Sequence, residues 1–276
     1  MSKAAGTLII VGGHEKKEGT RCILEYIAQA AKTRKGALVL VTVATDVPEQ
    51  VAAKYVAVFQ ELGVKHVAVL DIRTREDACA DENVRKLRGA SVVFFTGGDQ
   101  LRLTSQIGDS PVYQCLQQFH AHGGTIAGTS AGAAAMPATM IVSGADETSS
   151  TISAVGMAPG LGLLENVVID SHFAERGRME RLLGAVAQNP RNLGLGIDED
   201  TAIVVQRGKT FQVLGSGAVY ILDGSSIAFS SLSEGRPEGI MSIYGVTLHV
   251  LAQGDRYDLE MRCPVLPHED RHRRSS

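Results

Sequence analysis

Ser130 is the residue whose type and setting most clearly predict chemistry. It lies in the segment GTSAG (residues 128–132), which matches the pattern G-x-S-x-G and directly follows an apolar segment of strand length. Glycines on both sides of a serine let a strand turn sharply into a helix and leave the hydroxyl exposed at the edge of a sheet. The N–H of Ala131, at the start of that helix, can then donate to a developing oxyanion. The segment therefore predicts a nucleophilic serine, with a serine that only caps the helix as the alternative.

A serine nucleophile needs a general base, and only two of the eight histidines lie at the ends of apolar segments of strand length. His172 comes just after residues 166–170 and is the stronger candidate. His14 lies beside two glycines, so it could line the pocket or hold a turn. We therefore expect His172 to be the base.

An imidazole base is oriented by a carboxylate. Asp198, Glu199 and Asp200 all follow the apolar segment 193–197, and the residue types alone do not choose among them. In each case the chain order is nucleophile, histidine, acid. The α/β-hydrolases place the acid before the histidine, so this order predicts a different family with the same chemistry.

Two further segments at predicted strand ends carry useful groups. Residues 96–100 (TGGDQ) contain two glycines, which allow the backbone to approach a substrate closely and make this segment the candidate for a second oxyanion donor. Arg176, Arg178 and Arg181 lie within six residues, just after the predicted base. Arginine binds carboxylates through two parallel hydrogen bonds, so the cluster predicts an acidic ligand. Pairing with neighbouring acids such as Asp170 is the alternative.

The elements that must position these residues alternate between apolar strands and amphipathic helices. Strands that are apolar throughout belong to parallel sheets covered on both faces, and the βαβ order predicts a doubly wound α/β fold. In such sheets ligands bind beyond the carboxyl ends of the strands, where all the residues above lie. Four shorter strands, expected near residues 202–205, 210–213, 218–222 and 246–251, are interpreted as an antiparallel extension of the same sheet. With no linker or repeat, we expect one domain over residues 1–276, with a flexible tail from about 265.

Composition excludes several function classes. Apolar residues make up 44% of the 276 residues and charged residues 21%, which is typical of a packed soluble protein. A formal net charge of −3 does not favour binding to nucleic acid or to an anionic membrane. The four cysteines match no metal-ligand spacing and predict reduced thiols. No segment near the N-terminus is apolar for long enough to predict a secretion signal or a membrane span, which favours the cytoplasm.

Several motifs resemble those of the cyanophycinases, within the serine peptidase family that also contains the aspartyl dipeptidases. They span residues 97 to 202 in the family's order, and the chain length also fits. Resemblance to the cyanophycinases themselves depends mainly on the GTSAGA form, the three arginines and the length. The matching segments are GGDQ (97–100), GTSAGA (128–133), DxHF (170–173), RGRMERL (176–182) and GIDEDTA (196–202).

The resemblance implies a flavodoxin-like three-layer sandwich, related to class I glutamine amidotransferases, in a homodimer that needs no metal or cofactor. It also implies a triad of Ser130, His172 and Glu199, which selects one of the three acids. The oxyanion hole would be formed by the N–H groups of Gly98 and Ala131.

The substrate implied by the resemblance is cyanophycin, a poly-aspartate backbone with an arginine attached to each side chain. Cleavage would release β-aspartyl-arginine dipeptides. Ser171 stands where cyanophycinases carry glutamine, and the shorter side chain loses an amide contact that bears on specificity. The other residues implied to contact substrate are Gln100, Asp170, Arg176, Arg178 and Arg181.

Three alternatives differ in class or substrate. An aspartyl or isoaspartyl dipeptidase of the same family would use the same triad on shorter substrates. A small-molecule-binding, amidotransferase-like module would have lost catalysis, which the intact serine, histidine and acid set argues against. A nucleotide-binding Rossmann protein is disfavoured because the chain has no G-x-G-x-x-G and no suitably placed acid after the next strand.

Overall fold

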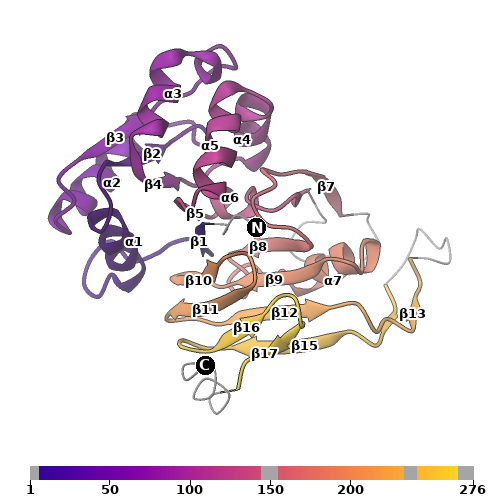
Figure 1. The fold of residues 1–276 in the computed structure, drawn as a ribbon. Helices are drawn as coiled ribbons and strands as arrows, with labels where there is room; N and C mark the ends of the chain where they lie inside the picture. The colour runs from indigo at the N-terminus through magenta and orange to yellow at the C-terminus, as the bar shows by residue number, and fades with distance from the viewer. Residues whose placement is uncertain (1–5, 144–154, 233–240, 267–276) are drawn as a thin grey trace.

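The structure, a computed structural model, describes residues 6–143, 155–232 and 241–266 (Figure 1). From residue 267 onward, the predicted flexible tail lies outside the described residues. Within the described ranges, no helix is both long and apolar enough to cross a membrane.

Nine strands of the described chain form what we call the main sheet, in the order β17-β16-β11-β10-β1-β5-β4-β2-β3. From β1 to β3 all neighbours pair in parallel, and from β1 to β17 all pair antiparallel. This confirms the predicted α/β class, with a mostly parallel centre and an antiparallel C-terminal extension. The strands are β1 (Thr7–Val11), β2 (Ala37–Val41), β3 (Val67–Leu70), β4 (Ala90–Phe95), β5 (Thr125–Thr129), β10 (Thr201–Gln206), β11 (Thr210–Gly215), β16 (Arg256–Asp258) and β17 (Cys263–Pro264).

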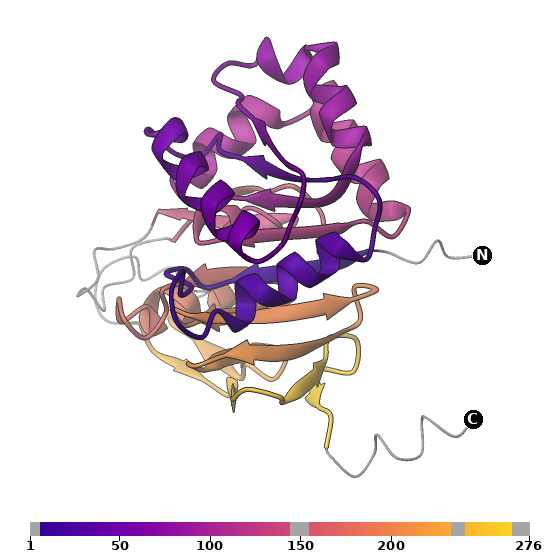
Figure 2. The same ribbon diagram turned by 90° about the vertical axis from the view of Figure 1, so that its left-hand side faces the viewer.

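Helices cover both faces of the parallel half, which is why its strands are apolar throughout. One face packs against α1 and α2, and the other against α3, α4 and α5 (Figure 2). Apolar residues along α1, such as Ile23 and Ile27, recur at helical spacing and are buried against β1 and β2. The helices are α1 (Cys22–Lys32), α2 (Pro48–Glu61), α3 (Asp81–Arg88), α4 (Gln100–Ile107) and α5 (Pro111–Ala121), with a 3₁₀ turn at Asp77–Cys79.

A second sheet, absent from the sequence prediction, contains β8 (Val167–Ser171), β9 (Leu193–Ile197), β12 (Val219–Asp223) and β15 (Thr247–Leu251). Its order is β15-β12-β9-β8, with only β8 and β9 parallel. The prediction of a single extended sheet was therefore wrong for the strands expected at 218–222 and 246–251. Periodicity gives the faces of a strand but not its pairing partner, and these strands pack face to face on the main sheet instead of joining its edge.

Helix α7 (Met179–Gln188) covers the far side of the second sheet. In β8, Val167 and Ile169 face the core shared with the main sheet, while Val168 faces α7. Gly194 of β9 lets α7 approach closely, because a Cβ there would lie 2.9 Å from Leu182 Cγ. The helix begins at Met179, after a turn over the preceding residues.

Three short elements complete the described chain. The hairpin β6–β7 (Thr139–Ser143 and Gly156–Pro159) and the hairpin β13–β14 (Phe229–Ser230 and Ile243–Tyr244) lie outside the two sheets, and α6 (Ala131–Ala134) follows β5. One apolar core takes side chains from both sheets and from α3, α4 and α5. This shared core supports the prediction of one domain, which a single cooperative unfolding transition would test.

Candidate active site

Ser130 lies on a sharp turn between β5 and α6. Its backbone has φ 53° and ψ −115°, a conformation that non-glycine residues rarely adopt. Both flanking glycines are needed for this turn: a Cβ on Gly128 would lie 2.6 Å from the Gly132 carbonyl oxygen, and one on Gly132 would lie 2.6 Å from the Phe95 oxygen. The Ser130 side chain makes no capping hydrogen bond to α6. The structure therefore has the predicted turn without the capping role.

The Ser130 hydroxyl begins a chain of hydrogen bonds. Ser130 Oγ lies 2.8 Å from His172 Nε2, and His172 Nδ1 lies 2.6 Å from Glu199 Oε1. Because a carboxylate only accepts, Nδ1 carries the proton and donates to Glu199. In the neutral ring Nε2 is then free to accept the hydroxyl proton, which is the arrangement that activates a serine.

The register of the strands explains how these groups meet. In the main sheet Val11 pairs with Thr129, so the loop after β1 lies beside the serine turn. In the second sheet Ser171 pairs with Ile197, so the residues that follow β8 and β9 lie together. The nucleophile therefore follows a strand of the main sheet, the histidine follows β8 of the second sheet, and the acid lies in the loop from β9 to β10 that joins the two sheets.

The loop after β1 holds the imidazole in place. The backbone N–H of His172 donates to the backbone carbonyl of Gly12 over 2.8 Å. A Cβ on Gly13 would lie only 2.3 Å from His172 Cε1, and Gly13 has φ 111°. Glycine is required there, both for the backbone conformation and for the space that the ring occupies.

Electrostatics favour the neutral base and the charged acid. His172 is 4% exposed, and burial lowers the pKa of its imidazole although the hydrogen bond to Glu199 opposes this. Partial burial of Glu199 raises the pKa of its carboxyl, but hydrogen bonds from His172 and His14 outweigh it and the net shift is downward. Neutral imidazole and carboxylate are the forms that general-base catalysis needs.

Only Glu199, of the three adjacent acids, hydrogen bonds to His172 in the described chain. Asp198 accepts from the N–H groups of Ala174 and Ala218, each over 3.0 Å. Asp200 accepts from the Lys16 N–H over 3.0 Å and from a serine hydroxyl. The outer two acids thus hold loops, and the middle one faces the base.

The two predicted oxyanion donors border the same pocket as Ser130. A Cβ on Gly97 would lie 3.3 Å from Ser130 Cβ, so the loop after β4 passes directly against the nucleophile. Gly98 has φ 142°, and a Cβ there would lie 2.0 Å from the Ala44 oxygen. The N–H of Ala131 is the first in α6 and has no partner inside that helix.

All six residues predicted to contact substrate line this pocket, together with the triad serine and histidine. They are Gln100, Asp170, Ser171, Arg176, Arg178 and Arg181. The Gln100 side chain donates to the Ile141 carbonyl over 2.8 Å and so holds the β6–β7 hairpin beside the pocket.

Asp170 is already paired with two of the arginines. Its carboxylate is 1% exposed and accepts from Arg178 over 3.1 Å and from Arg181 Nε over 2.8 Å, with a second Arg181 contact. Arg176 is exposed and forms no ion pair within the described part of the chain. Arg178 and Arg181 thus have the expected pairing with Asp170, and the expected role in ligand binding is left to Arg176.

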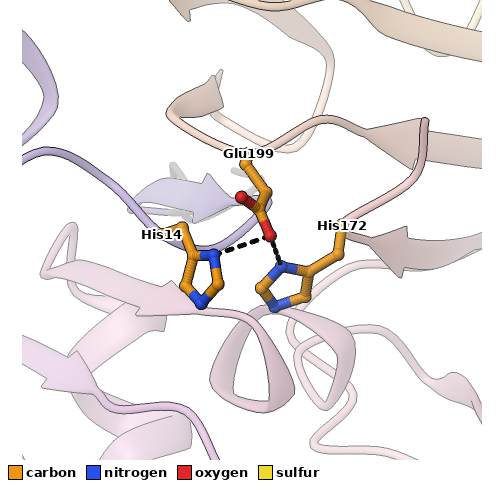
Figure 3. A group of neighbouring side chains, drawn as sticks. All are labelled: His14, His172 and Glu199. Atoms are coloured by element: carbon orange, nitrogen blue, oxygen red, sulfur yellow. Dashed lines mark hydrogen bonds and ion pairs between the residues drawn. The ribbon is translucent and has the colours of Figure 1, made fainter. Parts of the chain in front are cut away.

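Two residues of the β1 loop have contacts that sequence reasoning did not assign. His14 Nδ1 lies 2.7 Å from Glu199 Oε1 (Figure 3). Glu15 is 3% exposed and accepts from the Thr129 hydroxyl over 2.6 Å and from the Tyr55 hydroxyl. Position at a strand end was the available signal, but it does not reveal which group a side chain meets.

His14, His172 and Glu199 offer three possible metal ligands within 4.8 Å of one another. Their nitrogen–oxygen distances of 2.6 and 2.7 Å are hydrogen-bond lengths. Ligands around one zinc ion at ordinary bond lengths lie about 3.3 Å apart, so a metal would have to spread this group. As it stands, the group is a hydrogen-bond network.

Comparisons with known proteins find a family and relatives that match most of the chain. A family model described as peptidase family S51 matches residues 7–213. The chain is 40% identical over 263 residues to a cyanophycinase of Trichormus variabilis, covering 94% of this chain and 87% of that protein. It is 36% identical over 263 residues to a cyanophycinase of Geminocystis herdmanii, covering 94% and 96%. A crystal structure of a peptidase from an acI-B1 actinobacterium has a TM-score of 0.71 at 22% identity, covering 94% of this chain and 99% of that chain, which shows a shared fold.

Proposed function

Because the chain belongs to peptidase family S51, we propose that it is a cyanophycinase that hydrolyses the backbone of cyanophycin to β-aspartyl-arginine dipeptides. The observation that carries the proposal is the unbroken hydrogen-bond chain from Ser130 through His172 to Glu199, beside a pocket whose Arg176 has no ion pair with the described residues. The relatives named above support the choice of substrate, since they match over most of both chains.

The proposed mechanism follows from the positions of these groups. His172 Nε2 takes the hydroxyl proton as Ser130 Oγ attacks the scissile carbonyl carbon, and Glu199 stabilises the imidazolium that forms. The N–H groups of Gly98 and Ala131 donate to the oxyanion. Collapse breaks the C–N bond, His172 returns the proton to the leaving amine, and an acyl-enzyme remains. Water, deprotonated by His172, then releases the acid and restores Ser130.

Substrate recognition is proposed to depend on the pocket arginines. Arg176 is the exposed guanidinium beside the triad and is suited to a substrate carboxylate. Asp170 is not available to a substrate guanidinium unless its two arginine partners rearrange, so we assign it to holding Arg178 and Arg181. Gln100 and Ser171 complete the proposed lining.

The test is dipeptide release from purified cyanophycin. Ser130→Ala should abolish release, while Ser226→Ala, at an exposed serine, should release dipeptide at the wild-type rate. Both proteins should unfold at the wild-type temperature. Undiminished release by Ser130→Ala would overturn the proposal.

Two alternatives are separated by the choice of substrate and probe. A dipeptidase would cleave aspartyl or isoaspartyl dipeptides at least as well as the polymer, measured as kcat/KM. A module without catalysis would act on neither, and a serine-directed phosphonate or sulfonyl fluoride would not label it at Ser130. Comparing wild type with Ser171→Gln on the polymer then measures what the departure from the family's glutamine does to specificity.

Assembly and compartment belong to the same proposal. We propose a homodimer, and the edge strand β15 supports it because Leu248 and Val250 are 49% and 56% exposed there. Light scattering would test it. We propose a cytoplasmic location, in keeping with four free cysteines, and cell fractionation would test that.

A further inference from the structure

His14 lies beside the triad and makes a short polar contact with its acid. Its side chain is 71% exposed, and its Nδ1 lies 2.7 Å from Glu199 Oε1. Its ring meets the ring of His172 edge-on, with centroids 4.9 Å apart and planes at 79°. A side chain this exposed contributes little to the core, so its contact with the acid needs another explanation.

The two histidines share one carboxylate oxygen. His172 Nδ1 and His14 Nδ1 lie 2.6 and 2.7 Å from the same atom, Glu199 Oε1 (Figure 3). A carboxylate oxygen has two lone pairs and accepts two hydrogen bonds, so both Nδ1 atoms carry a proton. The acid is therefore held from two directions.

The backbone of His14 is held in an uncommon conformation for this contact. Its φ is 45°, close to the 53° of Ser130 and the 51° of His172. A left-handed conformation at a non-glycine residue is unfavourable and is concentrated at functional sites. Packing of an exposed side chain does not offset such a cost. The interaction gained at this position is the hydrogen bond to Glu199.

His14 also connects the two halves of the site. It follows β1 in the main sheet, as Ser130 follows β5, whereas His172 follows β8 of the second sheet and Glu199 lies in the loop from β9 to β10. The Glu199 side chain is 25% exposed, so without a second donor it can turn toward solvent and release the base. The chain already joins the backbone of Glu199 to the main sheet, since β10 begins two residues later, and the contact with His14 fixes its side chain.

We propose that His14 is a positioning residue for the reaction, whose Nδ1–H holds Glu199 in the orientation that aligns His172 with Ser130. The inference rests on the proposed function, because it requires these three residues to be the catalytic triad. His14 does not line the substrate pocket. Its loss should therefore lower kcat and leave KM unchanged.

The charges around the base predict a second effect. His172 faces Glu199, Arg176 and His14, and a proton on His14 places a positive charge beside the base. Removing His14 removes that charge, so His172 should become protonated at a higher pH. The acidic limb of the kcat/KM profile should move upward in a variant without the ring.

Two substitutions separate the donor from the strained backbone. His14→Gly relieves the positive φ and removes the donor, so the protein should be no less stable while kcat falls about 10- to 100-fold. His14→Asn keeps an N–H where Nδ1 lies and tolerates the left-handed conformation, so it should recover most of kcat. His66→Ala, at an exposed histidine before β3, is the matched control and should behave as wild type.

A spectroscopic readout does not depend on turnover. In an inactive Ser130→Ala background, the His172 Nδ1 proton should give a far-downfield NMR signal from its hydrogen bond to Glu199. Adding His14→Gly should weaken or shift that signal, and adding His14→Asn should restore it.

The outcomes distinguish the two levels of the argument. Dipeptide release by Ser130→Ala would reject the proposed function itself. If Ser130→Ala is inactive but His14→Gly keeps the wild-type kcat and pH profile, only the role of His14 is rejected. A His14→Asn variant as slow as His14→Gly would likewise overturn the assignment of Nδ1–H as the working group.

Discussion

Two groups of polar residues border the same pocket but are built in opposite ways. The triad network (Ser130, His172, Glu199) connects two sheets through single hydrogen bonds, and its nucleophile and acid are partly exposed. The arginine cluster (Asp170, Arg178, Arg181) comes from one short segment and surrounds a carboxylate that is 1% exposed.

The difference teaches which property each group controls. A buried charge stabilises a fold only while its partners remain, because removing one partner leaves the other charged and desolvated. The triad residues have partners that water can replace in part. Changes in the triad network should therefore alter rates, and changes in the arginine cluster should alter folding.

The largest effect is expected for His172→Ala. Loss of the base should lower kcat for cyanophycin about 10⁴- to 10⁶-fold, as in other serine peptidases that lose a triad member. The unfolding midpoint in denaturant should stay close to wild type. Steady-state dipeptide release and a urea titration measure the two quantities. If His172→Ala failed to fold, changes in the triad network would affect folding as changes in the arginine cluster do, and the contrast between them would be wrong.

Asp170→Asn should have its main effect on stability, whereas His172→Ala has its main effect on kcat. Two guanidinium groups would lose their shared anion in a buried setting, which costs about 3–5 kcal/mol of unfolding free energy. The control is Asp46→Asn, which removes an acid that is 94% exposed from its pair with Arg102 and should leave the unfolding midpoint unchanged. Equal midpoints for the two variants would show that the arginine cluster is not a structural unit.

Arg176 lies in the same short segment as Arg178 and Arg181, but its side chain is exposed to solvent. Arg176→Ala should raise KM for the polymer about tenfold or more and leave stability unchanged, because the guanidinium has no partner in the described chain. Arg176→Lys should fall between, since an ammonium group cannot bind a carboxylate through two parallel hydrogen bonds. Arg85→Ala, at an exposed arginine of α3, is the control. An unchanged KM would remove Arg176 from substrate binding.

A change at Tyr55 tests whether the buried hydrogen bonds of Glu15 also support turnover by the triad network. Burial and the neighbouring Glu15 raise the pKa of the Tyr55 hydroxyl, so it stays protonated and donates to that carboxylate. Tyr55→Phe should cost about 1–2 kcal/mol of stability. It should slow turnover less than tenfold, through Thr129 beside the nucleophile. Tyr26→Phe, at a tyrosine that is 41% exposed, should change neither quantity.

Much of this site could be predicted because parallel strands end at a common edge. That rule located Ser130, His172 and the three acids from short apolar segments, and the structure brings one acid to the base. Residue types did not choose Glu199 from its neighbours; the family resemblance did. Asp198 and Asp200 accept from backbone N–H groups of neighbouring loops, whereas Glu199 accepts from imidazoles, and this difference depends on loop conformation.

The remainder depended on pairings between distant segments. Strands β12 and β15 have the apolar pattern of sheet strands, but periodicity does not say that β12 pairs with β9 and β15 with β12 in a second sheet. His14 and Glu15 were visible as polar residues at a strand end. Their partners, Glu199 and Tyr55, are 185 and 40 residues away in the chain.

The smallest effect concerns the pH at which the triad network loses its base. His172 must be neutral to accept the serine proton, and burial lowers the pKa of its imidazole, although the hydrogen bond that it donates to Glu199 opposes this. Activity should therefore persist below the pH at which an exposed histidine titrates, and be lost as the pH falls through the lowered pKa. The kcat/KM profile reports this ionisation in the free enzyme.

Arg176 faces the same ring, and its positive charge lowers the same pKa. Arg176→Ala should move the acidic limb upward, by less than about one pH unit, whereas Arg176→Lys should leave it in place. An acidic limb at or above the pH at which an exposed histidine titrates would show that water reaches the base. The triad network would then not combine a partly exposed acid with a buried base.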